Sequence, residues 1–307
     1  MPELPEVETI ARGLARSVTG DVIESVWLGK KKEPLKSTAT EIASVLEQSR
    51  ITEVRRMGKH IVFDLDRGTP MAHSSNGRTS KTRGKGSVSS VALRADRSAA
   101  GGSTAAPAKA QWIVHLGMTG RLQVCDPETA IAKHTHAILT LSSKRELRFV
   151  DPRRFGRLSV SGSAGFAATG VEPLEVDPDR FVELFRGRKT PIKSALLNQR
   201  LLRGVGNIYA DESLFRAGIR PRRRAQSITH EQWRRLYLSL QEVLNEAIAL
   251  GGSSVSDYVN ADGEEGFFQL QHRVYGREGE PCLVCETPIR RVVIAGRSSH
   301  YCPKCQK

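Results

Sequence analysis

Four cysteines near the end of the chain have the spacing of a metal site. They form two pairs with two residues inside each pair and sixteen residues between the pairs: Cys282, Cys285, Cys302 and Cys305. Thiolates at this spacing supply four tetrahedral ligands for Zn²⁺, and the residues between the pairs are enough for one β-hairpin. Because four protein ligands leave no position for water, the ion would be structural. The alternative is two unrelated cysteine pairs or disulfides.

The first residues of the chain could supply a nucleophile. If Met1 is removed, Pro2 presents a secondary amine, and an α-amine titrates near neutrality, far below a lysine. Such an amine can attack the anomeric carbon of a deoxyribose, expel the base and form an iminium ion that permits strand scission. Glu3 could act as an acid on the ring oxygen or as a base for the sugar proton. The plainer interpretation is a helix preceded by turn residues.

A helix and a set of strands must position the N-terminal groups. Residues 5–16 are predicted to be helical, because Pro5 suits a first helical position and the apolar residues form one stripe. From there to about Val160 the pattern is typical of β-strands. The clearest strand segments are 58–65, 111–116, 136–141 and 146–150. Several short strands after one helix predict a sandwich or barrel-like domain.

The second half of the chain has a helical pattern. Helices are predicted at 193–202 and 208–217, separated by a Gly-Val-Gly-Asn turn, with Gly218 where a C-terminal glycine belongs. A longer helix is predicted to begin near Thr229, with the Thr-x-x-Gln spacing of a capping box.

Residues 67–110 interrupt the β pattern. They are dominated by Ser, Thr, Ala, Gly, Lys and Arg and have no usable periodicity. Such a composition buries too little apolar area to offset its chain entropy, so we predict a disordered insertion between two strands. Its eight Lys or Arg and one Asp could add non-specific affinity for DNA. A solvated loop without a role is an equal alternative.

Composition limits the class of protein. The 307 residues allow two or three domains, and 47 Lys and Arg against 33 Asp and Glu give a net charge of +14. This surplus favours a polyanionic partner, although a merely soluble basic protein fits equally. No apolar run approaches the ~20 residues that span a bilayer, and the start lacks a signal peptide, so a cytoplasmic location is expected. In a reducing compartment, a cluster of four cysteines favours a metal site over disulfides. The fifth cysteine, Cys125, is then interpreted as a structural thiol.

Five motifs, in order along the chain, resemble the formamidopyrimidine-DNA glycosylase family. They are Met1-Pro-Glu-Leu-Pro-Glu-Val-Glu8, His115-Leu-Gly-Met-Thr-Gly120, Asp151-Pro-Arg-Arg-Phe-Gly156, Gly204-Val-Gly-Asn-Ile-Tyr-Ala210 and the cysteine ribbon. The resemblance runs essentially end to end except for residues 67–110. It implies a multidomain α+β fold with an N-terminal β-sandwich and leading helix (1–165), a helix–two-turn–helix domain (172–262) and a zinc ribbon (266–307).

The resemblance also implies an activity. Members of this family remove oxidised purines, such as 8-oxoguanine and formamidopyrimidines, from duplex DNA through a Schiff base at the N-terminal proline. Strand scission by β,δ-elimination at the abasic site follows. The implied cofactor is one structural zinc ion and the implied partner is damaged double-stranded DNA. We therefore expect a monomer that needs no membrane and lies with the nucleoid through its DNA.

The family's catalytic residues match Pro2, Glu3, Lys59, Arg297 and Glu6. The resemblance implies that Lys59 donates a proton in elimination, that Arg297 serves the second elimination step and binds phosphate, and that Glu6 supports the amine. Taken alone, a lysine at a strand start is usually surface charge.

The family's DNA contacts carry over to two groups of residues. Phosphate contacts match His134, Arg154, Lys189 and Asn207. A flipped base leaves a gap in the stack, and the residues implied to fill it are Met118, Arg153 and Phe155. Considered singly, Met118 and Phe155 would be ordinary core residues and Arg153 a solvated charge.

Two positions depart from the family pattern, and three other functions compete. Ser256 stands where many relatives carry a basic residue, and His60 stands where an aromatic residue is frequent. The nearest rival is the endonuclease VIII-like class, which typically opens Pro-Glu-Gly-Pro-Glu, whereas this chain has Leu4. A zinc-ribbon DNA-binding protein without catalysis is the second. A metal-dependent nuclease is the third, but this sequence has no acidic cluster fitted to hold two cations.

Overall fold

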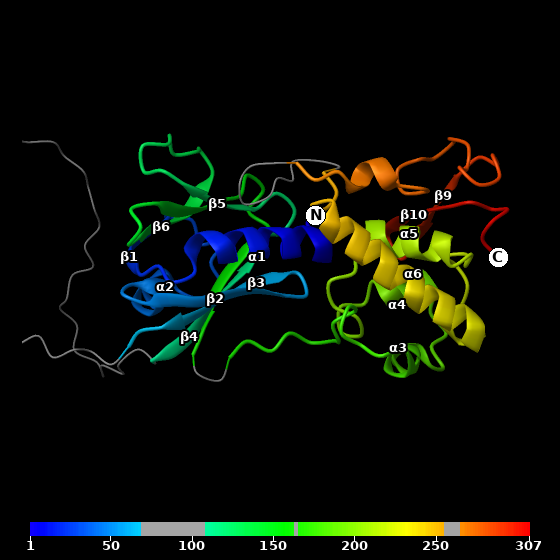
Figure 1. The fold of residues 1–307 in the computed structure, drawn as a ribbon, viewed down its shortest axis with the longest axis horizontal. Coiled ribbons are helices and arrows are strands. Elements are labelled where there is room, and N and C mark those ends of the chain that lie inside the picture. Colours follow the sequence, from blue (N-terminus) through cyan, green and yellow to red (C-terminus); the bar gives the residue numbers. More distant parts are fainter. Residues whose placement is uncertain (69–107, 163–164, 255–264) are drawn as a thin grey trace, which may run out of the picture.

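The chain folds into a β-sheet lobe and a helical lobe, and its N-terminus lies where the two meet (Figure 1). The computed structural model describes residues 1–68, 108–162, 165–254 and 265–307. The mixed α+β class predicted from the sequence is confirmed by two four-stranded sheets, a group of helices and a C-terminal hairpin. In the described part of the chain, no helix combines the length and apolar character needed to cross a membrane.

Helix α1 (Leu4–Val18) confirms the predicted leading helix and belongs to both lobes. Glu3 caps it, with the Glu6 carboxylate accepting the Glu3 N–H at 2.8 Å. Leu4 packs into the core of the helical lobe, whereas Val7 and the later apolar residues of α1 pack into the core of the β lobe. The helix is therefore fixed at its first turn by one lobe and along its length by the other.

Two antiparallel sheets enclose the core of the β lobe. One has the order β2-β3-β4-β8 and the other β1-β6-β7-β5. Phe63, Trp112 and Phe149 are among the large side chains buried between them. The strands are β1 (Ile23–Leu28), β2 (Arg50–Met57), β3 (His60–Asp66), β4 (Lys109–His115), β5 (Arg121–Cys125), β6 (Thr135–Leu141), β7 (Glu146–Val150) and β8 (Arg157–Ser161).

A second helix lies in the stretch that was predicted to be wholly β. Helix α2 (Ala39–Leu46) begins at Thr38, whose hydroxyl accepts the Glu41 N–H at 3.1 Å. The prediction was wrong here because only two side chains of this helix, Ile42 and Leu46, are buried. Eight residues with so short an apolar stripe give little periodicity to detect.

The predicted insertion at 67–110 joins two neighbouring strands. Asp66 at the end of β3 pairs directly with Lys109 at the start of β4, and the Arg67 N–H donates to the Ala108 carbonyl at 2.9 Å. The upper boundary was therefore placed two residues too late, because Lys109 and Ala110 belong to a strand. The remaining residues of the insertion, 69–107, lie outside the described ranges, and their predicted disorder stays a prediction.

Because β3 and β4 meet at Asp66 and Lys109, the sheet does not need the insertion to close. We predict that replacing residues 69–107 by an Asn-Gly turn leaves the melting temperature within a few degrees of the parent's. The segment removed contains six Lys or Arg and one Asp, so non-specific DNA affinity should depend less steeply on salt. Thermal melting and the salt slope of binding to undamaged duplex test this. A variant that fails to fold would show that the segment is structural.

The helical lobe is built around helices α5 and α6. Helix α5 (Asn207–Arg216) ends before Gly218, which has a φ of +69° as predicted for a C-terminal glycine. Helix α6 (His230–Ala249) begins at Thr229 with the predicted capping box. Two shorter helices, α3 (Pro178–Phe185) and α4 (Ile192–Leu196), complete the lobe.

The helix predicted at 193–202 is wrong beyond Leu196. The chain turns at Asn198, whose side-chain oxygen accepts the Arg200 N–H at 3.0 Å. A side chain that bonds its own backbone two residues on competes with the helical hydrogen bond. The turn brings the following glycine-rich segment against the start of α1, where the Leu4 N–H donates to the Gly204 carbonyl at 3.0 Å.

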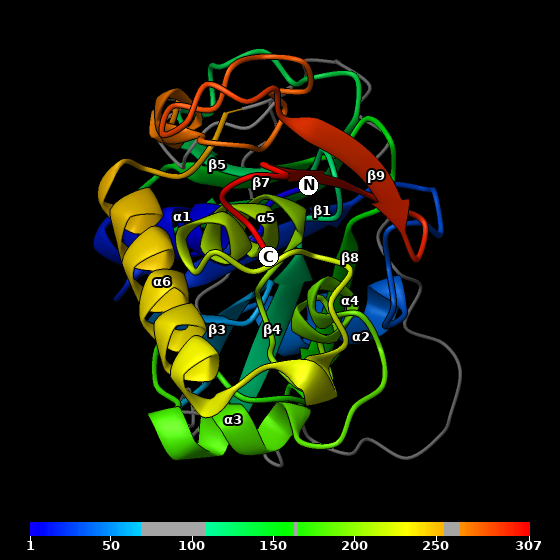
Figure 2. The same ribbon diagram turned by 90° about the vertical axis from the view of Figure 1, so that its right-hand side faces the viewer.

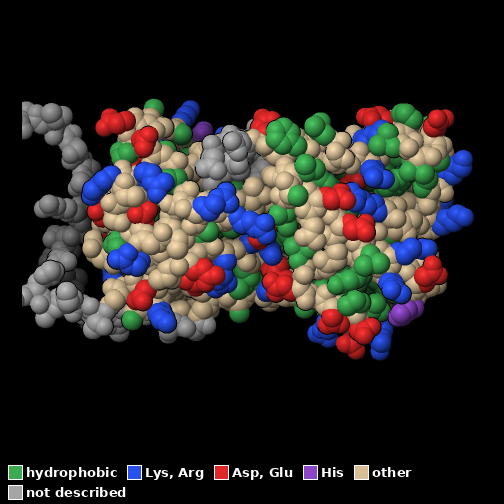
Figure 3. Space-filling view, viewed as in Figure 1, with side chains coloured by type: hydrophobic (Ala, Val, Ile, Leu, Met, Phe, Trp, Pro, Cys, Tyr) green, Lys and Arg blue, Asp and Glu red, His purple; other side chains and the backbone are tan. Residues whose placement is uncertain are grey.

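The C-terminal hairpin packs on helix α5. Strands β9 (Arg290–Ile294) and β10 (Arg297–Tyr301) form the hairpin predicted between the cysteine pairs (Figure 2). A small core that includes Phe215 of α5, Val274 and Ile289 lies beneath it. On the face of the molecule in Figure 3, basic and acidic side chains alternate over both lobes, so the positive surplus forms no single patch there.

Candidate active site and metal centre

The carboxylate of Glu6 ties the start of α1 to the helical lobe. Besides the Glu3 N–H, it accepts the Ser253 N–H at 2.8 Å and the Tyr209 hydroxyl. Gly252 must lack a side chain, since a Cβ there would lie 2.9 Å from the Glu6 Cγ. Glu6 is 2% exposed. It therefore fixes the chain's first residues against α5 and against the segment that follows α6.

Glu3 lies at the start of helix α5 with its carboxyl group in a dry environment. One carboxylate oxygen accepts the Ile208 N–H at 3.4 Å, and Gly206 makes room for it, since a Cβ there would lie 2.1 Å from the Glu3 Cδ. Burial raises the pKa of Glu3 to about 7, against the opposing effect of the Lys59 ammonium. A carboxyl group that titrates near neutrality can both hold and release a proton, as acid–base catalysis requires.

Lys59 is placed beside Glu3 by the turn between β2 and β3. Gly58 in that turn has a φ of +60°, and its N–H donates to the Glu172 carboxylate at 2.7 Å. Lys59 is 9% exposed, and burial lowers its pKa while the negative charge of Glu3 opposes the change. A lysine with a lowered pKa is a better proton donor and acceptor near neutral pH than an ordinary one.

Arg297 reaches the same region from the C-terminal hairpin. It begins β10, whose backbone is held by the fully buried ion pair of Lys193 and Asp211, 2.6 Å apart. The Lys193 ammonium donates to the Ser298 carbonyl at 2.6 Å, and the His300 N–H donates to Asp211 at 2.9 Å. This clamp fixes the hairpin against α4 and α5 and leaves the Arg297 side chain exposed.

A cavity of about 670 Å³ brings several of the predicted residues together. Both lobes and the hairpin contribute to its wall, which Met1 partly covers. The predicted residues that line it are Glu3, Lys59, Met118, Asn207 and Arg297. Pro2 is buried, and its chain neighbours Met1 and Glu3 both line the cavity, so removal of Met1 would free the proline nitrogen beside this wall.

Some buried polar atoms of the cavity wall have no hydrogen-bond partner among the described residues. They are the second carboxylate oxygen of Glu3, the Ser194 hydroxyl and the Asn207 amide oxygen. Buried polar atoms without partners are costly, and they are tolerated where a ligand supplies the missing bond. The cavity is therefore suited to a polar ligand.

Among the lining residues that were not predicted as site residues, His115 and Tyr275 carry titratable rings. The His115 Nδ1 accepts the Gly117 N–H at 3.0 Å, which places the ring proton on Nε2, and burial lowers its pKa to about 4. Tyr275 is positioned by Glu212, which accepts its N–H at 2.8 Å. His115 opens the quoted His-Leu-Gly-Met-Thr-Gly motif, a signal that could have found it, whereas Tyr275 had no comparable signal.

The other predicted DNA contacts lie outside the cavity, on exposed loops. Arg153, Arg154 and Phe155 follow β7, and Phe155 is 53% exposed. His134 precedes β6 and Lys189 precedes α4, and both are exposed. The departure at Ser256 lies outside the described residues. The departure at His60 is a half-buried ring packed between the rings of His115 and Phe166, so it supports the cavity wall from behind.

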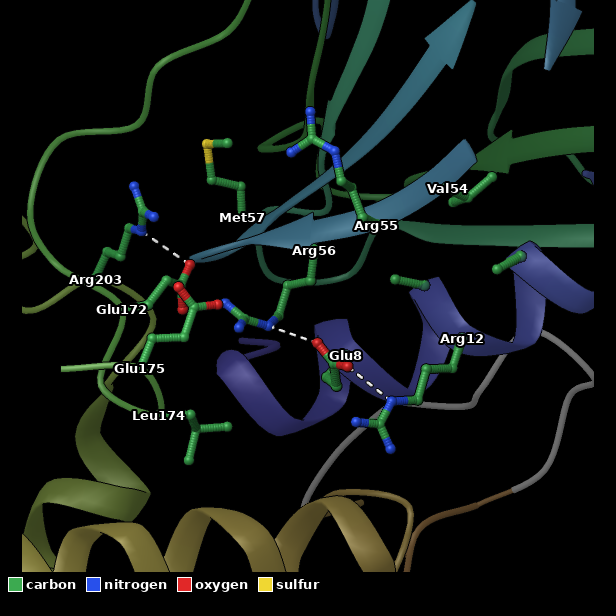
Figure 4. A pocket seen from close by; sticks show the side chains of 12 residues that line it. Glu8, Arg12, Val54, Arg55, Arg56, Met57, Glu172, Leu174, Glu175 and Arg203 are labelled. Atoms are coloured by element: carbon green, nitrogen blue, oxygen red, sulfur yellow. Dashed lines mark hydrogen bonds and ion pairs between the residues drawn. The ribbon is translucent and has the colours of Figure 1, made fainter. Parts of the chain in front are cut away.

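A second cavity, of about 550 Å³, lies between α1, β2 and the start of the helical lobe (Figure 4). Several of its charged side chains pair with one another. Arg56 donates to Glu8 at 2.7 Å and to Glu172 at 2.6 Å, and Glu172 also accepts from Arg203 at 2.8 Å. Arg56 is 6% exposed, so this network is a buried ionic link between the lobes.

The four C-terminal cysteines have the geometry of a tetrahedral metal site. Their sulfur atoms all lie within 4.8 Å of one another, and individual separations are 3.4, 3.5 and 3.9 Å. A Zn–S bond of about 2.3 Å gives S–S edges of about 3.8 Å in a tetrahedron. The donor set and spacing therefore fit one structural zinc ion held by Cys282, Cys285, Cys302 and Cys305.

Cys302→Ser is predicted to release the zinc ion. Duplex binding should then weaken by about tenfold or more, because the charge-assisted phosphate contact expected of Arg297, worth about 1.5–3 kcal/mol, would be lost. The hairpin's own core is too small to hold Arg297 in place without the metal. Cys125→Ser is the matched control, since Cys125 lies in β5, outside the cysteine cluster. Zinc content and the dissociation constant for lesion-containing duplex are measured for both. Unchanged binding by zinc-free protein would separate the ribbon from DNA recognition.

The fold and the site define a class of protein: a two-lobed enzyme whose N-terminal residues line a polar cavity beside a zinc finger. Family models match residues 1–158 (formamidopyrimidine-DNA glycosylase N-terminal domain), 169–259 (the H2TH domain of the same enzymes) and 279–307 (zinc finger found in FPG and IleRS). The chain belongs to the formamidopyrimidine-DNA glycosylase family.

Individual relatives agree over the full length. The chain is 42% identical to the formamidopyrimidine-DNA glycosylase of Solibacter usitatus, with 100% of both chains covered. It resembles the crystal structure of the MutM (FPG) protein of Thermus thermophilus, with 39% identity, a TM-score of 0.77 and coverage of 99% and 98%. A Lactococcus lactis FPG mutant in complex with Fapy-dG-containing DNA has 28% identity, a TM-score of 0.80 and complete coverage of both chains. The protein is thus a base-excision glycosylase that acts on damaged DNA.

Proposed function

We propose that the chain removes oxidised purines, 8-oxoguanine and formamidopyrimidines, from duplex DNA and then cuts the strand at the abasic site. Solved relatives include complexes with Fapy-dG-containing DNA and with carbocyclic 8-oxo-G-containing DNA, which support this substrate class. The observation that carries the proposal is the arrangement of Pro2 and Glu3. Glu3 lines a cavity that Lys59 and Arg297 also line, and Pro2 is buried in the chain between Met1 and Glu3, both of which are lining residues.

Base removal begins at the proline nitrogen once Met1 is gone. The lone pair of the Pro2 nitrogen forms a bond to C1′ of the damaged nucleotide, and the electron pair of the glycosidic bond leaves with the base, which takes up the proton that the nitrogen loses. Glu3, protonated near neutral pH, gives its proton to the sugar ring oxygen as the ring opens. The product is an iminium ion that joins the enzyme covalently to C1′.

The iminium ion makes strand scission possible. It acidifies the 2′ proton, and loss of that proton to a base expels the 3′ phosphate (β-elimination). A second proton loss then expels the 5′ phosphate (δ-elimination). We assign proton transfer at this stage to Lys59, whose pKa is lowered by burial, and the binding of the departing phosphate to Arg297. Glu6 holds the amine's position through its contacts with α5 and Ser253.

DNA binding is assigned to both lobes. Asn207 lines the cavity at the start of α5, and we assign a phosphate contact to its side chain. Further phosphate contacts are assigned to the exposed residues His134, Arg154 and Lys189. The gap left by the flipped base is filled by Met118, Arg153 and Phe155.

We assign three domains to this function, with the bounds 1–165, 172–262 and 266–307. Three separate hydrophobic cores support the division.

Borohydride trapping tests the proposal directly. Only an enzyme that forms an iminium ion gives a reducible covalent adduct, so duplex with 8-oxoguanine opposite cytosine should yield a protein–DNA band in the presence of borohydride. Incision of the same duplex should exceed incision of a thymine glycol duplex. Absence of the adduct would reject the amine mechanism, and a preference for thymine glycol would place the chain with the pyrimidine-specific enzymes.

A further inference from the structure

Three side chains, of which only Met118 also lines the cavity, are held on two loops that meet. Met118, on the loop between β4 and β5, is 39% exposed, and Phe155, on the loop between β7 and β8, is 53% exposed. The Arg153 guanidinium lies 4.9 Å from the centre of the Phe155 ring. Large apolar side chains left in water on short loops need a fixed backbone if they are to enter DNA in a defined geometry.

The carboxylate of Asp151 joins the two loops. Asp151 is fully buried, and one of its oxygens accepts the Thr119 hydroxyl at 2.6 Å while the other accepts the Gly156 N–H at 2.7 Å. The Thr119 oxygen in turn accepts the Arg153 N–H at 3.3 Å. The side chains of Asp151 and Thr119 therefore connect the loop that carries Met118 to the residues on both sides of Phe155.

The backbone of Asp151 extends the same network. Its N–H donates to the His134 carbonyl at 2.9 Å, and its carbonyl accepts the Arg154 N–H at 3.3 Å and the His136 Nε2–H at 3.0 Å. Among the described residues, the Asp151 carboxylate has no basic side chain as an ion-pair partner. A buried carboxylate satisfied by N–H and O–H donors alone acts as a hub that orders several loops at once.

The glycines of the two loops allow the backbones to touch. A Cβ on Gly117, whose φ is +67°, would lie 2.5 Å from the Phe155 carbonyl carbon. A Cβ on Gly156 would lie 2.5 Å from the Phe149 ring and 3.0 Å from the Asp151 carboxylate. At Gly117 the two loops therefore pack backbone against backbone.

We propose that Thr119 and Asp151 are positioning residues that set Met118 against Arg153 and Phe155 before DNA is bound. This inference rests on the proposed function, in which those three side chains fill the gap left by the flipped base. It predicts a specific defect: loss of the network slows reactions that require a base to leave an intact duplex stack, and spares those that do not.

Thr119→Val tests the inference, because valine has nearly the same shape and removes only the hydroxyl. Excision of 8-oxoguanine from duplex should fall by about tenfold or more, since a hydrogen bond to a buried charge is lost. Cleavage of a single strand with a preformed abasic site, where no stack must be filled, should change less than about twofold. Thr119→Ser keeps the hydroxyl and should match the parent within about twofold on both substrates.

The outcomes separate the inference from the function on which it rests. The inference would be overturned if Thr119→Val lost activity equally on both substrates or kept full activity on the duplex. It would also be overturned if Thr119→Ser failed to retain the parent's activity. Melting temperatures of the three proteins show that they are folded, and Asp151→Asn provides a second test at the hub if the valine variant does not fold. A parent protein that gives no borohydride adduct would reject the proposed function instead.

Discussion

Pro2→Gly protein is expected to excise 8-oxoguanine about 10³-fold more slowly than the parent while it binds lesion-containing duplex with similar affinity. Glycine keeps an α-amine, but this primary amine is a weaker nucleophile toward C1′ than the secondary amine of proline, which slows excision itself. Its adduct is moreover a protonated imine that can lose its N–H proton and with it the charge. The proline adduct has no such proton and remains a cation, which is the form that acidifies the neighbouring sugar proton. Pro2 is also buried, and its ring restricts the backbone there more than glycine would.

Single-turnover excision, borohydride trapping and duplex affinity measure this effect. Pro5→Ala is the matched control, since Pro5 also lies at the N-terminal end of the chain but within the first turn of α1. It should retain excision within a few-fold of the parent. Undiminished turnover by Pro2→Gly, or full activity of protein that mass spectrometry shows to retain Met1, would remove the proline amine from the mechanism.

Glu3→Gln is expected to slow excision by about 10²–10⁴-fold and to change its dependence on pH. The pKa of Glu3 is raised to about 7 by burial, so the proton that it donates is present below that pH and lost above it. Above about pH 8, where the amine is already free, excision by the parent should therefore fall about tenfold per pH unit. On the acid side it should fall as well, because the attacking α-amine, with a pKa of about 7.7–8.0 in ordinary surroundings, becomes protonated.

Glutamine preserves the shape of Glu3 but has no proton to give at any pH. The alkaline decline in the single-turnover rate should vanish in the variant, and the acid-side decline should remain. If the alkaline decline persisted unchanged in Glu3→Gln, the proton donor would have to be another group of the cavity, and Lys59 would be the first candidate.

Local signals in the sequence were enough to predict part of the fold and the metal site. The cysteine spacing, the capping box at Thr229 and the glycine after α5 each act within a few residues, and each agrees with the structure. Helix α4 was predicted too long because the side chain of Asn198 accepts the Arg200 N–H and so starts a turn, which the apolar pattern of this segment does not reveal. Helix α2 was missed although the Thr38-x-x-Glu41 capping spacing was present.

The full set of residues around the cavity was harder to predict from the sequence than the residues predicted to be catalytic. Glu3 and Lys59 were named from motifs, but their altered pKa values arise from burial by segments far away in the chain. Tyr275 reaches the cavity because Glu212 of α5 accepts three successive N–H groups from residues 273–275. Contacts of that kind depend on how the lobes pack, which no short stretch of sequence specifies.

The dependence of the first residues on the last third of the chain has a consequence for synthesis. Glu6 takes its partners from Tyr209 and Ser253, Glu3 lies against Ile208, and Arg297 is among the final residues. A ribosome-bound chain therefore displays its amino end long before a pocket exists around it. Under the mechanism proposed above, the proline amine would gain its reactivity toward sugars only when translation is nearly complete, and an unfinished polypeptide would not react with DNA.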